Sequence, residues 1–122
     1  MIQSVVPDTM AKSIAIGDPV DGRWAASAIR DTGGWAAVVD EDDIAPGITL
    51  LAQHTGLFTE PAGGVTVSGA RLLANQARLT KNDEVVLCLT GNGLKTVEVL
   101  DDTLESTPVI DPDIRQLEAM IS

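Results

Sequence analysis

An uninterrupted apolar run, Val-Val-Leu-Cys-Leu at residues 85–89, restricts the possible folds of this chain more than any other stretch. A strand with one face in water alternates apolar and polar residues, whereas a run without alternation suits a strand covered on both faces. Such a strand requires helices on both sides of its sheet. The run ends at once in the turn Thr90-Gly91-Asn92-Gly93.

Helical patterns alternate along the chain with short apolar runs, and proline and glycine mark the ends of the predicted helices. Asp18-Pro19 predicts a capped helix start, and Gly33-Gly34 predicts a stop. Pro46 predicts a kink or a late start in its segment, and Pro61 suits a first helical turn. We expect helices over residues 18–34, 40–56, 57–79 and 111–121.

The segments between these helices read as strands, which we expect over residues 13–17, 35–39 and 85–90, with a further short strand over 97–100. Strands that alternate with helices imply right-handed βαβ units. The predicted fold is therefore α/β, with three layers around a parallel sheet. At 122 residues the chain forms a single domain or a partial domain over 1–122.

Composition and charge restrict the partners. The formal net charge is −10, from 18 acidic and 8 basic residues, and such a surface repels phosphate backbones, so we expect no nucleic acid partner. No apolar run approaches the roughly 20 residues of a membrane helix, and the first residues lack the pattern of a signal peptide. Cys88 is the single cysteine, which we expect to be a buried small hydrophobe in a cytoplasmic protein.

Several residues could carry chemistry, each with a plainer alternative. The turn at 90–93 could present backbone N–H groups to an anion, or it could be a tight turn that needs positive φ at its glycines, which its spacing favours. Glu60 could tune a ligand or serve as a helix N-terminal acid. His54, the sole histidine, more simply meets free carbonyls at a helix end. The acids of residues 40–43 suit a solvated helix start better than a metal site.

Four stretches in the same order resemble threonine synthase, a pyridoxal-phosphate enzyme of the tryptophan-synthase-β fold group. They are AKSIAIGDPVDG (11–22), AIRDTGG (28–34), GLFTEPAGGVT (56–66) and VVLCLTGNGLK (85–95). The resemblance covers most of this chain but only the carboxyl-terminal third of a typical family member. It departs from the family pattern at Asp18, where asparagine is expected, and at Pro46-Gly47.

The resemblance implies a site for the ring end of pyridoxal phosphate. The hydroxyl of Thr90 corresponds to the group that contacts the pyridine nitrogen, with Gly91 beside it. Glu60, Ile16 and Gly17 correspond to positions that line the pocket. The phosphate-binding loop and the lysine that binds the cofactor covalently precede this region in the family and are absent here. We therefore expect weak or no cofactor binding by this chain alone, and no metal.

The function that the resemblance implies is that of the carboxyl-terminal portion of a lyase, part of the large domain of a fold-type II enzyme. That enzyme converts the phosphorylated amino acid O-phosphohomoserine and water to threonine and phosphate. We expect the chain to be inactive alone, and to self-associate or to pair with the missing amino-terminal portion. Two alternatives are a fragment of a threonine or serine dehydratase, and a non-catalytic module that docks on a partner or binds a small ligand.

Overall fold

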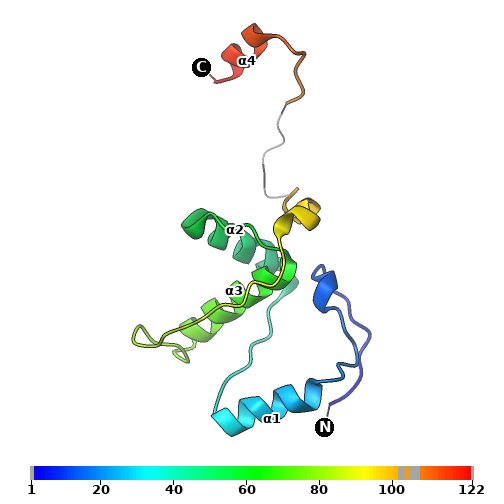
Figure 1. Ribbon diagram of the computed structural model, residues 1–122, viewed down its shortest axis with the longest axis vertical. Coiled ribbons are helices and arrows are strands. Elements are labelled where there is room, and N and C mark those ends of the chain that lie inside the picture. The colour runs from blue at the N-terminus through cyan, green and yellow to red at the C-terminus, as the bar shows by residue number, and fades with distance from the viewer. Residues whose placement is uncertain (1, 102–103, 105–107, 122) are drawn as a thin grey trace.

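The computed structural model describes residues 2–101, 104 and 108–121, and within these ranges the chain is helical (Figure 1). Its longer helices are α1 (Gly22–Thr32), α2 (Ile44–Thr55), α3 (Pro61–Asn75) and α4 (Ile114–Ile121). Short 3₁₀ helices connect them, namely η1 (Lys12–Ile14), η2 (Glu41–Asp43), η3 (Gly93–Lys95) and η4 (Val97–Leu100). The β-structure of the described ranges is an isolated antiparallel bridge between Thr59 and Asn92.

The predicted three-layer α/β fold with a parallel sheet is wrong. Residues 35–39 and 85–89 run as elongated irregular segments without a ladder between them (Figure 1). Residues 12–14 form η1, and residues 97–100 form η4 instead of a strand. A strand exists only where a neighbour accepts and donates its backbone hydrogen bonds. The apolar pattern of these segments reports a preference for burial, and it carries no information on whether such a neighbour is present.

Most of the predicted helix ends are confirmed. Gly33 follows α1 with φ 66°, and Gly56 follows α2 with φ 73°, so both use the left-handed conformation that glycine adopts without a steric penalty. Pro61 is the first residue of α3. Pro46 is the third residue of α2, where its missing N–H costs nothing, so the late start is the correct alternative.

The starts of α1 and α4 and the end of α3 differ from the prediction. The first helix begins at Gly22, because Asp18 and Pro19 precede a separate turn in which Gly22 N donates to Pro19 O. The third helix ends at Asn75, where Gln76 N and Arg78 N bond back to the last turn. The terminal helix begins at Ile114, and the carboxylate of Asp113 accepts from Arg115 N at 3.0 Å.

The core lies where α2 packs against α3, with Ile44 and Ile48 almost fully buried. Glycine allows the close approach: a Cβ on Gly64 would lie 2.6 Å from the Ile44 carbonyl oxygen, and one on Gly47 would lie 2.5 Å from the Gly64 oxygen. Ser68 Oγ donates to the Asp43 carbonyl at 2.7 Å, and Arg71 pairs with the Asp43 carboxylate at 2.9 Å. The packing of α2 against α3 fixes the first turn of α3. Glu60 directly precedes that turn, so its position is fixed as well.

An apolar groove runs along α3 between the two elongated segments. Its volume is about 330 Å³. Val39 and Ala37 line one side, Leu87 and Val85 line the other, and Leu73 is among the α3 residues between them. Arg78 lies over the ring of Trp35 at 3.6 Å from its centroid, which joins the end of α3 to the first elongated segment.

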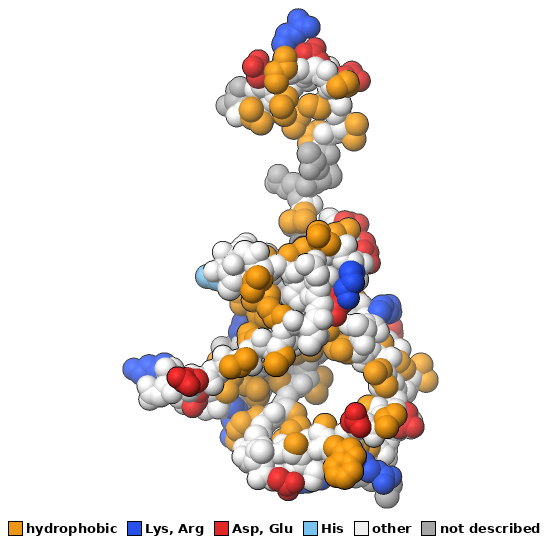
Figure 2. Space-filling model, viewed as in Figure 1, with side chains coloured by type: hydrophobic (Ala, Val, Ile, Leu, Met, Phe, Trp, Pro, Cys, Tyr) orange, Lys and Arg blue, Asp and Glu red, His pale blue; other side chains and the backbone are white. Residues whose placement is uncertain are grey.

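The chain exposes far more surface than a compact protein of its size. Its accessible area is 9494 Å², whereas a folded monomer of 12.8 kDa exposes about 6,300 Å². Hydrophobic side chains are spread over α1, α3 and α4 (Figure 2), and the Trp24 side chain is 76% exposed. Cys88 is also exposed, so the prediction of a buried cysteine is wrong. Across the part of the chain that the structure describes, no helix is long and apolar enough to cross a membrane.

Candidate functional site

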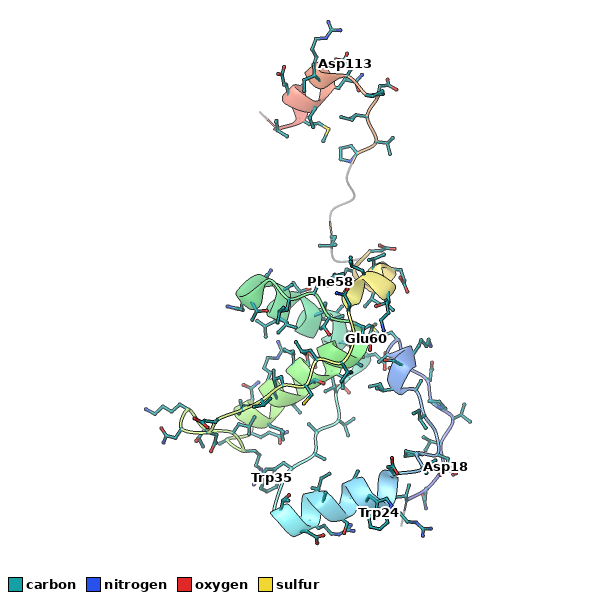
Figure 3. All side chains as sticks on the ribbon, in the orientation of Figure 1. Asp18, Trp24, Trp35, Phe58, Glu60 and Asp113 are labelled. Carbon is teal, nitrogen blue, oxygen red and sulfur yellow. The ribbon has the colours of Figure 1, made fainter. Side chains whose placement is uncertain are left out.

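Glu60 lies immediately before α3 and carries a buried carboxylate, of which 8% is exposed. It occupies the cap position of the helix, but its side chain makes no capping hydrogen bond. Instead Lys95 Nζ lies 2.9 Å from Oε2, and Ser13 Oγ donates to Oε1 at 3.3 Å. Figure 3 shows Glu60 between the start of α3 and η1. The carboxylate therefore joins three segments that lie far apart in the sequence.

The turn at 90–93 lies against residues 58–60 through three hydrogen bonds. Glu60 N and Thr59 Oγ1 both donate to the Gly91 carbonyl, at 3.2 and 3.0 Å, and Gly93 N donates to the Phe58 carbonyl at 3.1 Å. Both glycines are needed for contact: a Cβ on Gly91 would lie 2.0 Å from Glu60 Cδ, and one on Gly93 would lie 2.6 Å from the Phe58 ring.

The interpretation of this turn as one that needs positive φ is wrong. Within the described ranges, the glycines with positive φ are Gly33 and Gly56, so the turn does not need glycine for that reason. Two amides at its end already have acceptors, because Gly93 N bonds to Phe58, and Leu94 N bonds to the Asn92 side chain at 2.8 Å. Close backbone approach is the reason for both glycines.

Thr90 lies in the wall of a hollow of about 380 Å³ formed where this turn meets residues 57–59. Its neighbours there are the side chains of Leu57, Phe58 and Leu89 and the adjoining residues Thr59, Gly91 and Asn92. Thr90 is exposed, so its hydroxyl is accessible from solvent. The walls combine three large apolar side chains with the polar residues Thr59, Thr90 and Asn92, a mixture that suits one edge of a flat heteroaromatic ring.

The structure brings three of the five predicted site residues together and not the other two. Thr90, Gly91 and Glu60 meet as described above. Ile16 is 62% exposed, and Gly17 accepts from Val5 N at 2.9 Å, which ties it to the amino-terminal segment. Ser13, from the same motif, reaches Glu60 instead.

Lys95 is a site residue that the sequence analysis did not name. Its ammonium group is largely exposed, but it is the charge partner of Glu60. The available signal was that two stretches of the same resemblance carry opposite charges, the acid in 56–66 and the base in 85–95.

The other candidates have structural partners or lie elsewhere. His54 is in the last turn of α2 and is exposed. Of the acids at 40–43, Glu41 accepts from Met10 N at 2.8 Å and Asp43 pairs with Arg71. Among the residues that the structure describes, no group of three or more histidine, cysteine, aspartate or glutamate side chains could hold a metal ion.

The hydrogen bond from Lys95 lowers the pKa of the Glu60 carboxyl below its usual value of 4.5. Burial opposes this shift, and the positive charge of Lys95 and the hydrogen bond from Ser13 add to it. A lowered folded-state pKa contributes stability that is fully present above the usual pKa and is lost as the pH falls through the lowered value.

We therefore expect the free energy of unfolding to fall more steeply in acid for the parent chain than for Glu60→Gln, which cannot titrate at this position. The pKa values of Glu41 and Asp83 are also lowered, but these groups are common to both proteins and cancel in the comparison. Urea unfolding at a series of pH values below neutrality measures the difference. Parallel curves for the two proteins would contradict the expectation.

Comparison with known proteins decides the family. The model of the pyridoxal-phosphate dependent enzyme family matches residues 1–91. The chain belongs to this family. Threonine synthases are similar over most of its length: that of Methanosarcina acetivorans is 35% identical over 94% of this chain, and that of Methanocaldococcus jannaschii is 31% identical over the same share. The threonine synthase of Synechocystis is 40% identical over 73% of the chain.

The resemblance to threonine synthase is thus confirmed, and it concerns a part of that enzyme. The chain spans 28% of the length of the two archaeal threonine synthases and 23% of the cyanobacterial one. The donor set of the hollow fits one end of pyridoxal phosphate. Thr90 carries a hydroxyl, the kind of group that pairs with a ring nitrogen, whereas the residues that line the hollow with it include no cation for a phosphate group.

Proposed function

We propose that this chain is the carboxyl-terminal portion of a threonine synthase, the lyase that converts O-phosphohomoserine and water to threonine and phosphate. The similarity to threonine synthases over 94% of the chain supports the assignment to this enzyme. Because the chain has a single cysteine and cannot form an internal disulfide, it suits a cytoplasmic enzyme.

The single observation that carries the proposal is the placement of Thr90 in the wall of a hollow that Leu57, Phe58 and Leu89 also line. The Thr90 hydroxyl forms one hydrogen bond to the ring nitrogen of pyridoxal phosphate, a cofactor that acts as an electron sink when bound. A hydroxyl is neutral, so it does not hold that nitrogen protonated as a carboxylate would. Leu57, Phe58 and Leu89 exclude water from one side of the ring.

The chain alone is inactive in this proposal, because its own residues supply only the ring end of the site. Of its three lysines, Lys95 is paired with Glu60 2.9 Å away, and neither Lys12 nor Lys81 lines the hollow at Thr90. The amides of Gly93 and Leu94, at the end of the turn, already have acceptors within the chain. Covalent attachment and phosphate binding therefore fall to the rest of the enzyme.

The partner we propose is the amino-terminal portion of the enzyme. The apolar groove between residues 35–39 and 85–89 is open to a further segment, and the two segments that flank it have no ladder partner among the described residues. This chain alone exposes about 3,200 Å² more than a compact monomer, 9494 against about 6,300 Å². Permanent interfaces bury about 2,000–5,000 Å² counted over both partners, so this excess is enough for one side of such an interface. Self-association of the chain alone would use the same surface.

Substitutions at Thr90 test the proposed role, in the enzyme completed by its amino-terminal portion. We expect Thr90→Ala to fold and to bind the cofactor but to lose turnover. One hydrogen bond to a neutral group contributes about 0.5–1.5 kcal/mol, which corresponds to a loss of about two- to tenfold. The loss is larger if the bond strengthens as charge develops on the ring.

The matched variants are Thr90→Ser, which keeps the hydroxyl and should keep most activity, and Thr90→Asp, which should favour a protonated ring and shift the cofactor absorbance. Steady-state turnover and absorbance spectra of the three variants measure these effects. If Thr90→Ala equals the parent in both, the hydroxyl is not the partner of the ring nitrogen.

A further inference from the structure

The Thr90–Gly93 turn contains only an isolated bridge at Asn92 and the first residue of η3, yet it forms one wall of the proposed cofactor site. A hydrogen-bonding group at a ring nitrogen is effective only within a few tenths of an ångström of its place. The turn must therefore be held by something outside itself. The backbone bonds to Phe58 and Glu60 provide part of the restraint.

The Glu60 carboxylate provides a second restraint, because it lies against Gly91 within the turn and pairs with Lys95, two residues beyond it. Its Cδ and both oxygens lie so close to Gly91 that any side chain there would overlap them. Its Oε2 lies 2.9 Å from Nζ of Lys95, the last residue of η3, which follows the turn directly. The carboxylate itself is held by Ser13 on a third segment.

The two side chains of the ion pair differ in exposure. The Lys95 side chain is 63% exposed and the Glu60 side chain 8%. Removing the base would leave a buried carboxylate without its cation, and such a group moves toward water or takes up a proton. Either response releases η3 from α3. A surface ion pair that had no such burial would contribute little.

We propose that Glu60 is a positioning residue, which fixes the Thr90–Gly93 turn beside the cofactor through Lys95 and Gly91 and does not itself contact the ring. The ion pair, the Gly91 contact and the Ser13 hydrogen bond together form what we call the Glu60 clasp. Its importance for catalysis rests on the proposed function of Thr90, whereas its effect on the turn can be measured in this chain alone.

Amide hydrogen exchange, followed by NMR on the 122-residue chain, tests the clasp. Two amides report directly on the turn: that of Glu60, which donates to Gly91, and that of Gly93, which donates to Phe58. We expect Lys95→Met to speed the exchange of both at least about tenfold, because local opening governs exchange. Amides in the middle of α2 and α3 should keep their rates.

Two variants serve as controls. Lys95→Arg keeps the charge and should restore slow exchange at Glu60 and Gly93. Lys81→Met removes the same charge from an exposed turn between α3 and residues 84–90, and should leave both amides unchanged. Unchanged exchange in Lys95→Met overturns the proposal, and so does an equal increase at every helical amide, because that would be general loss of stability.

The two proposals fail in distinguishable ways. If Lys95→Met loosens the turn, while Thr90→Ala in the completed enzyme behaves as the parent, the clasp holds and the role of Thr90 is wrong. If Thr90→Ala loses turnover, while Lys95→Met leaves the two amides protected, the role of Thr90 holds and the clasp is wrong. When both hold, Lys95→Met and Thr90→Ala should shift the cofactor absorbance in the same direction, and Lys95→Arg should not.

Discussion

Threonine should form from O-phosphohomoserine only when this chain is combined with the amino-terminal portion of a threonine synthase, and neither piece should be active alone. The reason is the proposed division of the site, in which this chain supplies the ring end and the rest of the enzyme supplies the covalent and phosphate-binding ends. The corresponding portion of the Methanosarcina acetivorans enzyme is a suitable complement, since that relative is 35% identical over this chain. The change from no turnover to measurable turnover is the largest effect that we expect.

Release of phosphate and formation of threonine measure this complementation. Leu73→Asp places a charge in the apolar groove and should prevent pairing, whereas Ala74→Asp adds the same charge at an exposed neighbouring position and should not. Threonine formation by this chain alone, or a single lysine labelled in full after borohydride reduction with pyridoxal phosphate, would contradict the proposal. Consumption of threonine or serine by the combined pieces, without use of O-phosphohomoserine, would identify a dehydratase instead.

Gly64→Ala should destabilise the chain, although alanine is the better helix former. The new methyl group would lie 2.6 Å from the Ile44 oxygen and 2.8 Å from Ile48 Cγ1, so α2 and α3 must move apart. Overpacking of this kind costs about 1–3 kcal/mol, of which the gain in helix propensity, about 0.8–1.0 kcal/mol, offsets a part. We expect a net loss of about 1 kcal/mol or more in the free energy of unfolding.

Gly69→Ala is the matched control, because it makes the same change in the same helix. A Cβ there would meet only Val39 Cγ2, at 3.7 Å, which is ordinary van der Waals contact. Helix propensity then acts unopposed and should stabilise the chain by up to about 1 kcal/mol. Urea unfolding followed by helical circular dichroism measures both. A loss of stability in Gly69→Ala, or a gain in Gly64→Ala, would show that the close approach of α2 and α3 is not what these glycines serve.

Local features of the sequence predicted the helix ends well. Gly33, Gly56 and Pro61 act through their own backbone conformations, so a few neighbouring residues decide the outcome. Asp18-Pro19 failed although it is the same kind of signal, because a turn closed by Gly22 uses those residues first. The burial of Cys88 failed because burial depends on what covers a segment, which no local pattern states.

Local sequence pattern could show neither that residues 85–89 lack a strand partner nor that Glu60 pairs with Lys95 and Ser13. Residues 85–89 have the composition of a buried strand, but a strand also needs a neighbour. The resemblance grouped Thr90, Gly91 and Glu60. In the structure Gly91 lies against Glu60, and Thr90 is the residue next to Gly91 in the chain. The pairing of Glu60 with Lys95 and Ser13 joins residues far apart in the chain, and neither side chain is unusual in its own segment.

The order of synthesis has a consequence for the Glu60 clasp. Ser13 precedes Glu60 by 47 residues, whereas Lys95 follows it, so the nascent chain carries the hydroxyl partner long before the cationic one. At the usual 5–20 residues per second, residues 61–95 take roughly 2–7 s to be added. During that interval α2 and α3 can pair through local contacts, which close fast. The carboxylate stays hydrated until the base arrives, and the Thr90–Gly93 turn therefore becomes ordered after α2 and α3 have paired.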